Sequence, residues 1–127
     1  MRRWLLPLLL LLPWQAVGGE LTDYLYYRDV NVPPYQKLRE FFDMPDRPGR
    51  YEVTMFSDAF GPLTFRVLRV RGESEVQVTQ QRSWRVENHE FQYRFHNHEG
   101  KDDLIVEVAN SNPVFTARIS VYVVELP

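Results

Sequence analysis

All three histidines of the chain lie in one short segment, as His89, His96 and His98. His96 and His98 are two residues apart in a segment that alternates apolar and polar side chains, so both imidazoles project from the same face of a strand. Glu99 follows in the adjoining turn and adds a carboxylate oxygen to the two nitrogens. His96, His98 and Glu99 are therefore a candidate metal site. The same residues also form an ordinary solvated hairpin turn, and this alternative is favoured.

The sequence contains no recognisable catalytic motif. The His-Glu pairs at 89–90 and 98–99 lack the second histidine of a zinc-protease helix, because Tyr93 and Asp102 stand in its place. No serine has a Gly-x-Ser-x-Gly setting. The chain has no cysteine, which excludes thiol catalysis and Cys-based zinc sites. We therefore predict that the protein is not an enzyme and that it carries no cofactor.

Aromatic side chains form the second candidate site. Tyr24 and Tyr26 lie in a tyrosine-rich segment, and Trp84 lies beside two arginines. Flat rings with polar groups on one sheet face can stack on sugars or anchor a protein partner. Tyr24, Tyr26 and Trp84 are thus the candidate ligand-binding residues. The alternative is that several of these rings cover the open end of a hydrophobic core, since tyrosine is common in strands for packing reasons.

The elements that position these residues are predicted to be strands. Apolar and polar residues alternate with period two from Arg50 onward, which is typical of a strand with one buried face. The alternation covers residues 51–55, 63–70, 76–78, 84–86, 91–95, 104–108 and 115–123. In residues 63–70 the apolar side chains move from odd-numbered to even-numbered positions at Leu68 and Val70. A β-bulge near Val67 would explain this change.

The segments before Arg50 complete the predicted sheet. Residues 23–32 favour an edge strand that Pro33-Pro34 stops. Residues 35–42 favour a further strand, with a short helix as the alternative. Seven to eight strands of this length and spacing predict an all-β fold, an antiparallel β-sandwich of jelly-roll type.

The first nineteen residues have the pattern of a secretory signal peptide. Arg2 and Arg3 precede a leucine-rich apolar run, and small residues follow at 16–19. The run is shorter than the roughly 20 residues that a membrane-spanning helix needs. We therefore predict a signal peptide at 1–19 and a single β-sandwich domain at 20–127. The mature chain is expected to have no membrane span and to be periplasmic or secreted.

The net charge of −2 limits the classes of partner. Removal of Arg2 and Arg3 makes the remaining chain more acidic, which argues against nucleic acid and against an anionic membrane, because both require a concentrated basic face. The leading hypothesis is a non-enzymatic binding module for another envelope protein or an envelope component such as a glycan. Carbohydrate binding through exposed Tyr and Trp is the first alternative, and metal binding through His96 and His98 is the second. The sequence does not indicate an oligomeric state.

Overall fold

The computed structural model describes residues 24–127. The predicted signal peptide and its cleavage position lie outside these residues. The described part contains eight strands and no helix: β1 (Tyr26–Val32), β2 (Lys37–Phe42), β3 (Gly49–Ser57), β4 (Leu63–Arg71), β5 (Ser74–Ser83), β6 (His89–Asn97), β7 (Asp103–Asn110) and β8 (Ala117–Leu126). The predicted all-β fold is confirmed.

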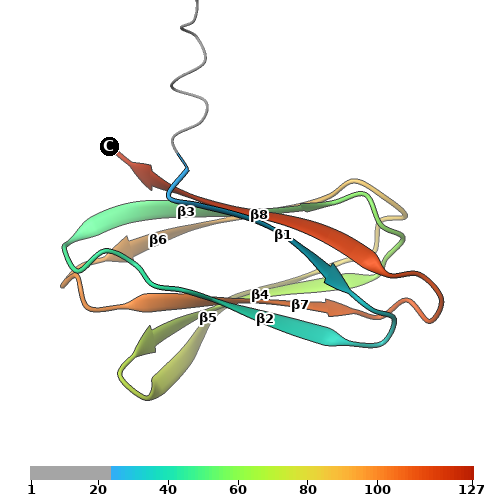
Figure 1. Ribbon diagram of the computed structural model, residues 1–127, viewed down its shortest axis with the longest axis horizontal. Helices are drawn as coiled ribbons and strands as arrows, with labels where there is room; N and C mark the ends of the chain where they lie inside the picture. Colours follow the sequence, from blue (N-terminus) through green and yellow to red (C-terminus); the bar gives the residue numbers. More distant parts are fainter. Residues whose placement is uncertain (1–23) are drawn as a thin grey trace, which may run out of the picture.

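The strands form two four-stranded antiparallel sheets that face each other (Figure 1). The first sheet has the order β1-β8-β3-β6, and the second has the order β2-β7-β4-β5. Every connection crosses from one sheet to the other except the β4–β5 hairpin. This is the strand order of a jelly roll, as the sequence predicts. Residues 37–42 are β2, so the strand interpretation of this segment is confirmed and the helix alternative is wrong.

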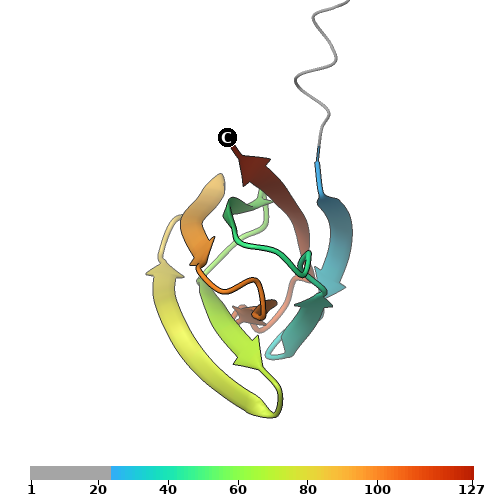
Figure 2. The ribbon, with the colours of Figure 1, turned by 90° about the vertical axis from the view of Figure 1, so that its left-hand side faces the viewer.

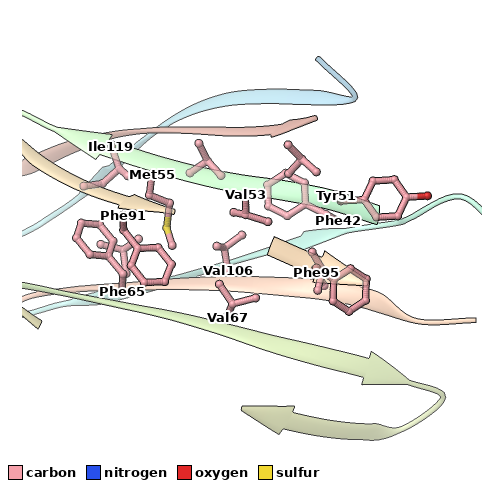
Figure 3. Packing of buried hydrophobic residues seen from close by; sticks show 14 of the residues in the cluster. Phe42, Tyr51, Val53, Met55, Phe65, Val67, Phe91, Phe95, Val106 and Ile119 are labelled. Carbon is pink, nitrogen blue, oxygen red and sulfur yellow. The ribbon is translucent and has the colours of Figure 1, made fainter. Parts of the chain in front are cut away.

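The alternating apolar residues of both sheets meet in one core (Figure 3). Val53 and Met55 of β3 are fully buried, and on the second sheet Phe65 of β4 is equally buried. Phe65 stacks on Phe91 of β6 with 5.7 Å between the ring centroids, so the aromatic contact joins the two sheets. Burial of each such side chain contributes about 1.5–3 kcal/mol. The core therefore stabilises the fold without disulfides.

The bulge near Val67 is present, but it does not cause the change of phase at Leu68. The extra residue is Val78 of β5, because Val67 pairs with Thr79 and Leu68 with Gln77. Strand β4 keeps an unbroken register with β7. Leu68 therefore points away from the main core, and it forms a second cluster with Val70 and Ile105.

The second sheet is curved around this second cluster. Arg39 on the edge strand β2 donates to Glu75 on the opposite edge strand β5 at 2.6 Å. A hydrogen bond between the two outer strands of a four-stranded sheet requires that sheet to be concave on its outer face. Figure 2 shows the corresponding curl of the β4–β5 hairpin.

The loops that follow β1, β3, β5 and β7 gather at one end of the sandwich, on the right in Figure 1. We call residues 33–36, 58–62, 84–88 and 111–116 the aromatic loop end. Strand β5 ends at Ser83, so the prediction that Trp84 and Val86 lie in a strand is wrong. Both side chains lie in the β5–β6 loop, where they are exposed.

Candidate functional site

Three tyrosines gather on the outer face of the first sheet. Tyr27 of β1 pairs with Tyr122 of β8, so both rings project from the same face. Their ring centroids are 5.2 Å apart. Tyr24 lies 5.7 Å from Tyr27 and 5.4 Å from Tyr122. We call Tyr24, Tyr27 and Tyr122 the tyrosine platform. Tyr24 and Tyr27 are about half exposed, so the platform presents aromatic surface to solvent.

A hollow of about 450 Å³ adjoins the platform at Tyr27. Its walls come from β1, β3, β8 and the loop after β3. Asp29, Arg118 and Ser120 supply polar groups, and Phe56 adds a further aromatic surface. The Ser120 hydroxyl donates to Oδ1 of Asp29 at 2.7 Å. The hollow thus combines apolar ring surface with charged and hydroxyl groups, which is the composition of a small-ligand site.

The electrostatics of the platform keep its central hydroxyl protonated. Burial raises the pKa of Tyr122, and the neighbouring Tyr27, Tyr24 and Asp29 raise this pKa further. Tyr122 therefore carries an O–H donor at neutral pH. The adjoining Asp29 carboxylate is an acceptor. Such an arrangement can stack on a ring and hydrogen-bond its hydroxyl groups, and it holds no activated nucleophile.

The structure separates the three predicted ligand-binding residues. Tyr24 belongs to the platform. Tyr26, two residues further along, has a ring that packs on Phe42 at 5.3 Å and a hydroxyl that donates to the carbonyl of Asp43. Trp84 lies in the aromatic loop end, 73% exposed. The sequence analysis did not identify Tyr122 as a partner of Tyr24. The signal that could have found it is its place among the outward-facing positions of the alternating segment 115–123.

The predicted metal ligands are only partly assembled. The rings of His96 and His98 are close, with 3.7 Å between their centroids. Glu99 accepts a hydrogen bond from Arg71 at 3.0 Å, so its carboxylate is engaged by β4. Across residues 24–127, no group of three His, Cys, Asp or Glu side chains is arranged to hold a metal ion. A site built on the two histidines stays a prediction.

His89 is separate from the other two histidines and is fully buried. Like Phe91, two residues further along β6, it points into the sandwich. Its Nε2–H donates to the carbonyl of Ala59 at 2.8 Å. Nδ1 is then the acceptor for the Ser83 hydroxyl at 2.6 Å. Burial lowers the pKa of His89, and Arg85 lowers it further, against the opposing effect of the Ala59 carbonyl. The pair resembles a nucleophile with its base, yet Ser83 is also buried. The two hydrogen bonds of His89 join β5 and β6 to the β3–β4 loop.

Comparison with known proteins supports the fold alone. The chain matches no protein-family model and no curated protein sequence. Among solved structures it is similar to the Yersinia pseudotuberculosis-derived mitogen, with a TM-score of 0.55 and 12% identity over 78% of this chain and 83% of that one. It is also similar to PirA, with a TM-score of 0.52 and 14% identity over 83% of this chain and 95% of that one. Within residues 24–127 there is no helix of the length and apolarity that crossing a membrane demands. The chain is thus a small β-sandwich protein that shares its fold with these two proteins.

Proposed function

We propose that the protein is an exported, non-enzymatic binding module that binds a carbohydrate component of the cell envelope on the tyrosine platform. The observation that carries the proposal is the gathering of Tyr24, Tyr27 and Tyr122 beside a polar hollow of about 450 Å³. The leading hypothesis from the sequence, a module for an envelope protein or envelope component, is thereby narrowed to one class of ligand. The secretory pattern of residues 1–19 supports the location in the periplasm or outside the cell.

The chemistry of the face supports a sugar over an apolar ligand. Pyranose rings present C–H groups on their flat faces and hydroxyl groups around their edges. The tyrosine rings can cover the flat faces, and Asp29, Ser120 and Arg118 can exchange hydrogen bonds with the edge. The Asp29–Ser120 hydrogen bond holds both groups in place before the ligand arrives. Such preorganisation lowers the entropic cost of binding.

The test is a glycan array that includes bacterial envelope polysaccharides, probed with residues 20–127 purified without a tag. Tyr27→Ala removes one ring of the platform, and loss of an aromatic anchor that the ligand buries costs more than about 1 kcal/mol, or about fivefold in Kd. Phe41→Ala is the matched control, because Phe41 has a similar exposure of 49% on the second sheet. The proposal predicts retention of at least one glycan by the wild type and the control, and weaker retention by Tyr27→Ala. An array that retains nothing, or equal binding by Tyr27→Ala, would contradict it, and turnover of the bound glycan would contradict the non-enzymatic part.

Metal binding at His96 and His98 is the second candidate function. The observation that favours it is the 3.7 Å between the two ring centroids. The test is metal analysis of the untagged protein against the His96→Ala/His98→Ala double variant. More bound metal in the wild type supports this function, whereas equal and negligible metal in both proteins removes it.

A further inference from the structure

The aromatic loop end concentrates exposed apolar surface. Among residues 24–127, six of the ten large apolar side chains that are exposed lie in its four loops. They are Tyr35 (73% exposed), Phe60 (45%), Trp84 (73%), Val86 (66%), Val114 (69%) and Phe115 (51%). Single exposed apolar residues are ordinary on a protein surface, but a group gathered at one place marks an interaction site.

The backbone of the projecting loop is already hydrogen-bonded within the protein. Oδ1 of Asn112 accepts from the N–H groups of Val114 and Phe115, both at 2.8 Å. Nδ2 of Asn110 donates to the carbonyl of Phe115 at 2.8 Å, and Nδ2 of Asn112 donates to the carbonyl of Gly61 at 3.3 Å. An unpaired backbone group costs several kcal/mol in hydrocarbon, so irregular loops normally stay out of lipid. These bonds remove much of that cost for the tip at Val114 and Phe115.

Two arginines lie beside Trp84 and can reach lipid phosphate groups. Arg82 stacks over the ring of Trp84, with its guanidinium carbon 4.5 Å from the centroid. Arg85 follows Trp84 directly, and neither arginine forms a salt bridge with a carboxylate of the described residues. Tryptophan and tyrosine favour the membrane–water interface, and long cationic side chains reach from there to phosphate groups. Asp58 and Glu87 lie in the same loops, so the contact with headgroups depends on the two arginine side chains and not on a net positive charge.

The turn at Tyr35 also lacks an explanation within the fold. Its φ is 59°, a left-handed conformation that costs a bulky residue about 1–2 kcal/mol. Gln36 N–H donates to the Pro33 carbonyl at 3.2 Å and closes a turn in which glycine or asparagine is preferred at position 35. Because the ring of Tyr35 is largely exposed, packing does not offset the strain. Strain of this kind is found at functional sites.

We propose that the aromatic loop end inserts into the surface of a lipid bilayer, with Trp84, Val114 and Phe115 in the acyl boundary and Arg82 and Arg85 at the headgroups. Insertion of apolar loops combined with attraction to phosphate is the physics of peripheral membrane binding. Side chains that project from four separate loops suit an acyl layer, which adapts its shape, better than a protein surface, which must supply a matching hollow for each group. The hollow of the sugar site shares Asp58, Ala59 and Thr116 with these loops. The inference does not depend on the sugar site, because the tyrosine platform itself lies on a sheet face.

The chain supplies its own probe for this insertion. Trp84 is the only tryptophan of residues 20–127, since Trp4 and Trp14 belong to the predicted leader. Tryptophan emission of the processed protein therefore reports on the aromatic loop end alone. Two kinds of vesicle are used: phosphatidylcholine, and phosphatidylcholine mixed with phosphatidylglycerol. The proposal predicts a blue shift with both kinds of vesicle and quenching by lipids brominated on their acyl chains.

Two double variants separate insertion from other causes. Val114→Ser/Phe115→Ser keeps Trp84 and is expected to bind vesicles at least tenfold more weakly in a co-sedimentation assay. Phe41→Ser/Val76→Ser changes exposed apolar residues outside the loop end and is expected to bind like the wild type. Circular dichroism and urea midpoints establish that both variants are folded. Tyr27→Ala is expected to keep full vesicle binding, which separates this proposal from the sugar site.

Three results would overturn the proposal. The first is unchanged Trp84 emission with no co-sedimentation on either vesicle. The second is binding to phosphatidylglycerol vesicles that Val114→Ser/Phe115→Ser does not weaken, which indicates adsorption by charge alone. The third is a lipid-independent blue shift that grows with protein concentration, which identifies a second copy of the chain as the occupant of the loop end.

Discussion

Replacement of Asn110 by alanine should lower stability more than any polar substitution on the surface. Asn110 is 2% exposed at the end of β7. Its Nδ2 donates to the carbonyls of Val32 at 3.0 Å and Phe115 at 2.8 Å. Its Oδ1 accepts from the N–H of Asn112 at 2.9 Å. One side chain therefore ties the ends of β1 and β7 to the loop before β8.

The magnitude follows from the groups that Asn110→Ala leaves without a partner. Two carbonyls and one N–H lose their hydrogen bonds, and each loss costs about 1 kcal/mol, with more where water cannot enter. The expected decrease in the free energy of unfolding is therefore about 3 kcal/mol. For a domain of this size that corresponds to a fall in Tm of roughly 15 °C.

Asn110→Asp tests the direction of the hydrogen bonds. The aspartate keeps the acceptor for Asn112 but loses the Nδ2 donor, and it turns a negative charge toward two carbonyl oxygens. It should therefore be less stable than the alanine variant at neutral pH, although it is closer in shape to asparagine. Asn31→Ala, at an exposed position of β1, is the matched control and should change stability by less than about 0.5 kcal/mol.

The assay is urea unfolding followed by circular dichroism, with a thermal scan of the same proteins. A loss of less than about 1 kcal/mol in Asn110→Ala would refute the reasoning, because water would then replace the side chain at little cost. The same conclusion would follow if Asn110→Asp were as stable as Asn110→Ala.

Three further predictions concern charge, pH and backbone strain. Glu107 is 3% exposed, and its carboxylate binds Arg66 and, at 3.4 Å, Nε of Arg39. Glu107→Gln should therefore lower the free energy of unfolding, measured in urea, by about 1–2 kcal/mol. A gain in stability would contradict this role of Glu107. Burial lowers the pKa of His89 in the folded protein. The buried neutral ring therefore contributes its full stability above the ordinary pKa of about 6.5. This contribution is lost as the pH falls from there through the lowered pKa of the folded state. His89→Gln can keep both hydrogen bonds and should flatten the pH dependence of Tm below about pH 6.5, whereas a slope equal to that of the wild type would exclude His89 as its source. Tyr35→Asn should raise the unfolding midpoint slightly because asparagine tolerates the left-handed turn, and a lower midpoint would show that the tyrosine ring packs usefully.

The strands were predictable because their alternation records directly which side chains are buried. Residues 91–95 and 117–123 alternate cleanly, and they lie in β6 and β8 with the expected inward phase. The prediction that Phe115 faces inward with them is wrong, because β8 begins at Ala117 and Phe115 is 51% exposed in the preceding loop. The change of phase at Leu68 could not be interpreted correctly from sequence. Its cause is a second apolar cluster on the outer face of the sheet, in which Leu68 and Val70 meet Ile105 from a strand that is distant in the chain.

The candidate site was predictable only in part, because sequence assigns residues to faces but does not show which faces meet. Tyr24 was identified, yet its partner Tyr122 comes from the last strand, and the pairing of β1 with β8 brings the two together. Tyr26 looked equivalent to Tyr24 but points inward. The grouping of Trp84 with Phe60 and Phe115 at one end likewise required the strand order, since three separate loops supply these rings.

The most direct test of the central claim is an NMR titration of the mature domain with soluble envelope oligosaccharides, followed through its backbone amide signals. We expect the largest shifts around the tyrosine platform and its hollow, at Tyr27, Asp29, Ser120 and Tyr122. Shifts confined to the loops around Trp84, or no shifts with any oligosaccharide, would contradict the assignment of this face as the binding site.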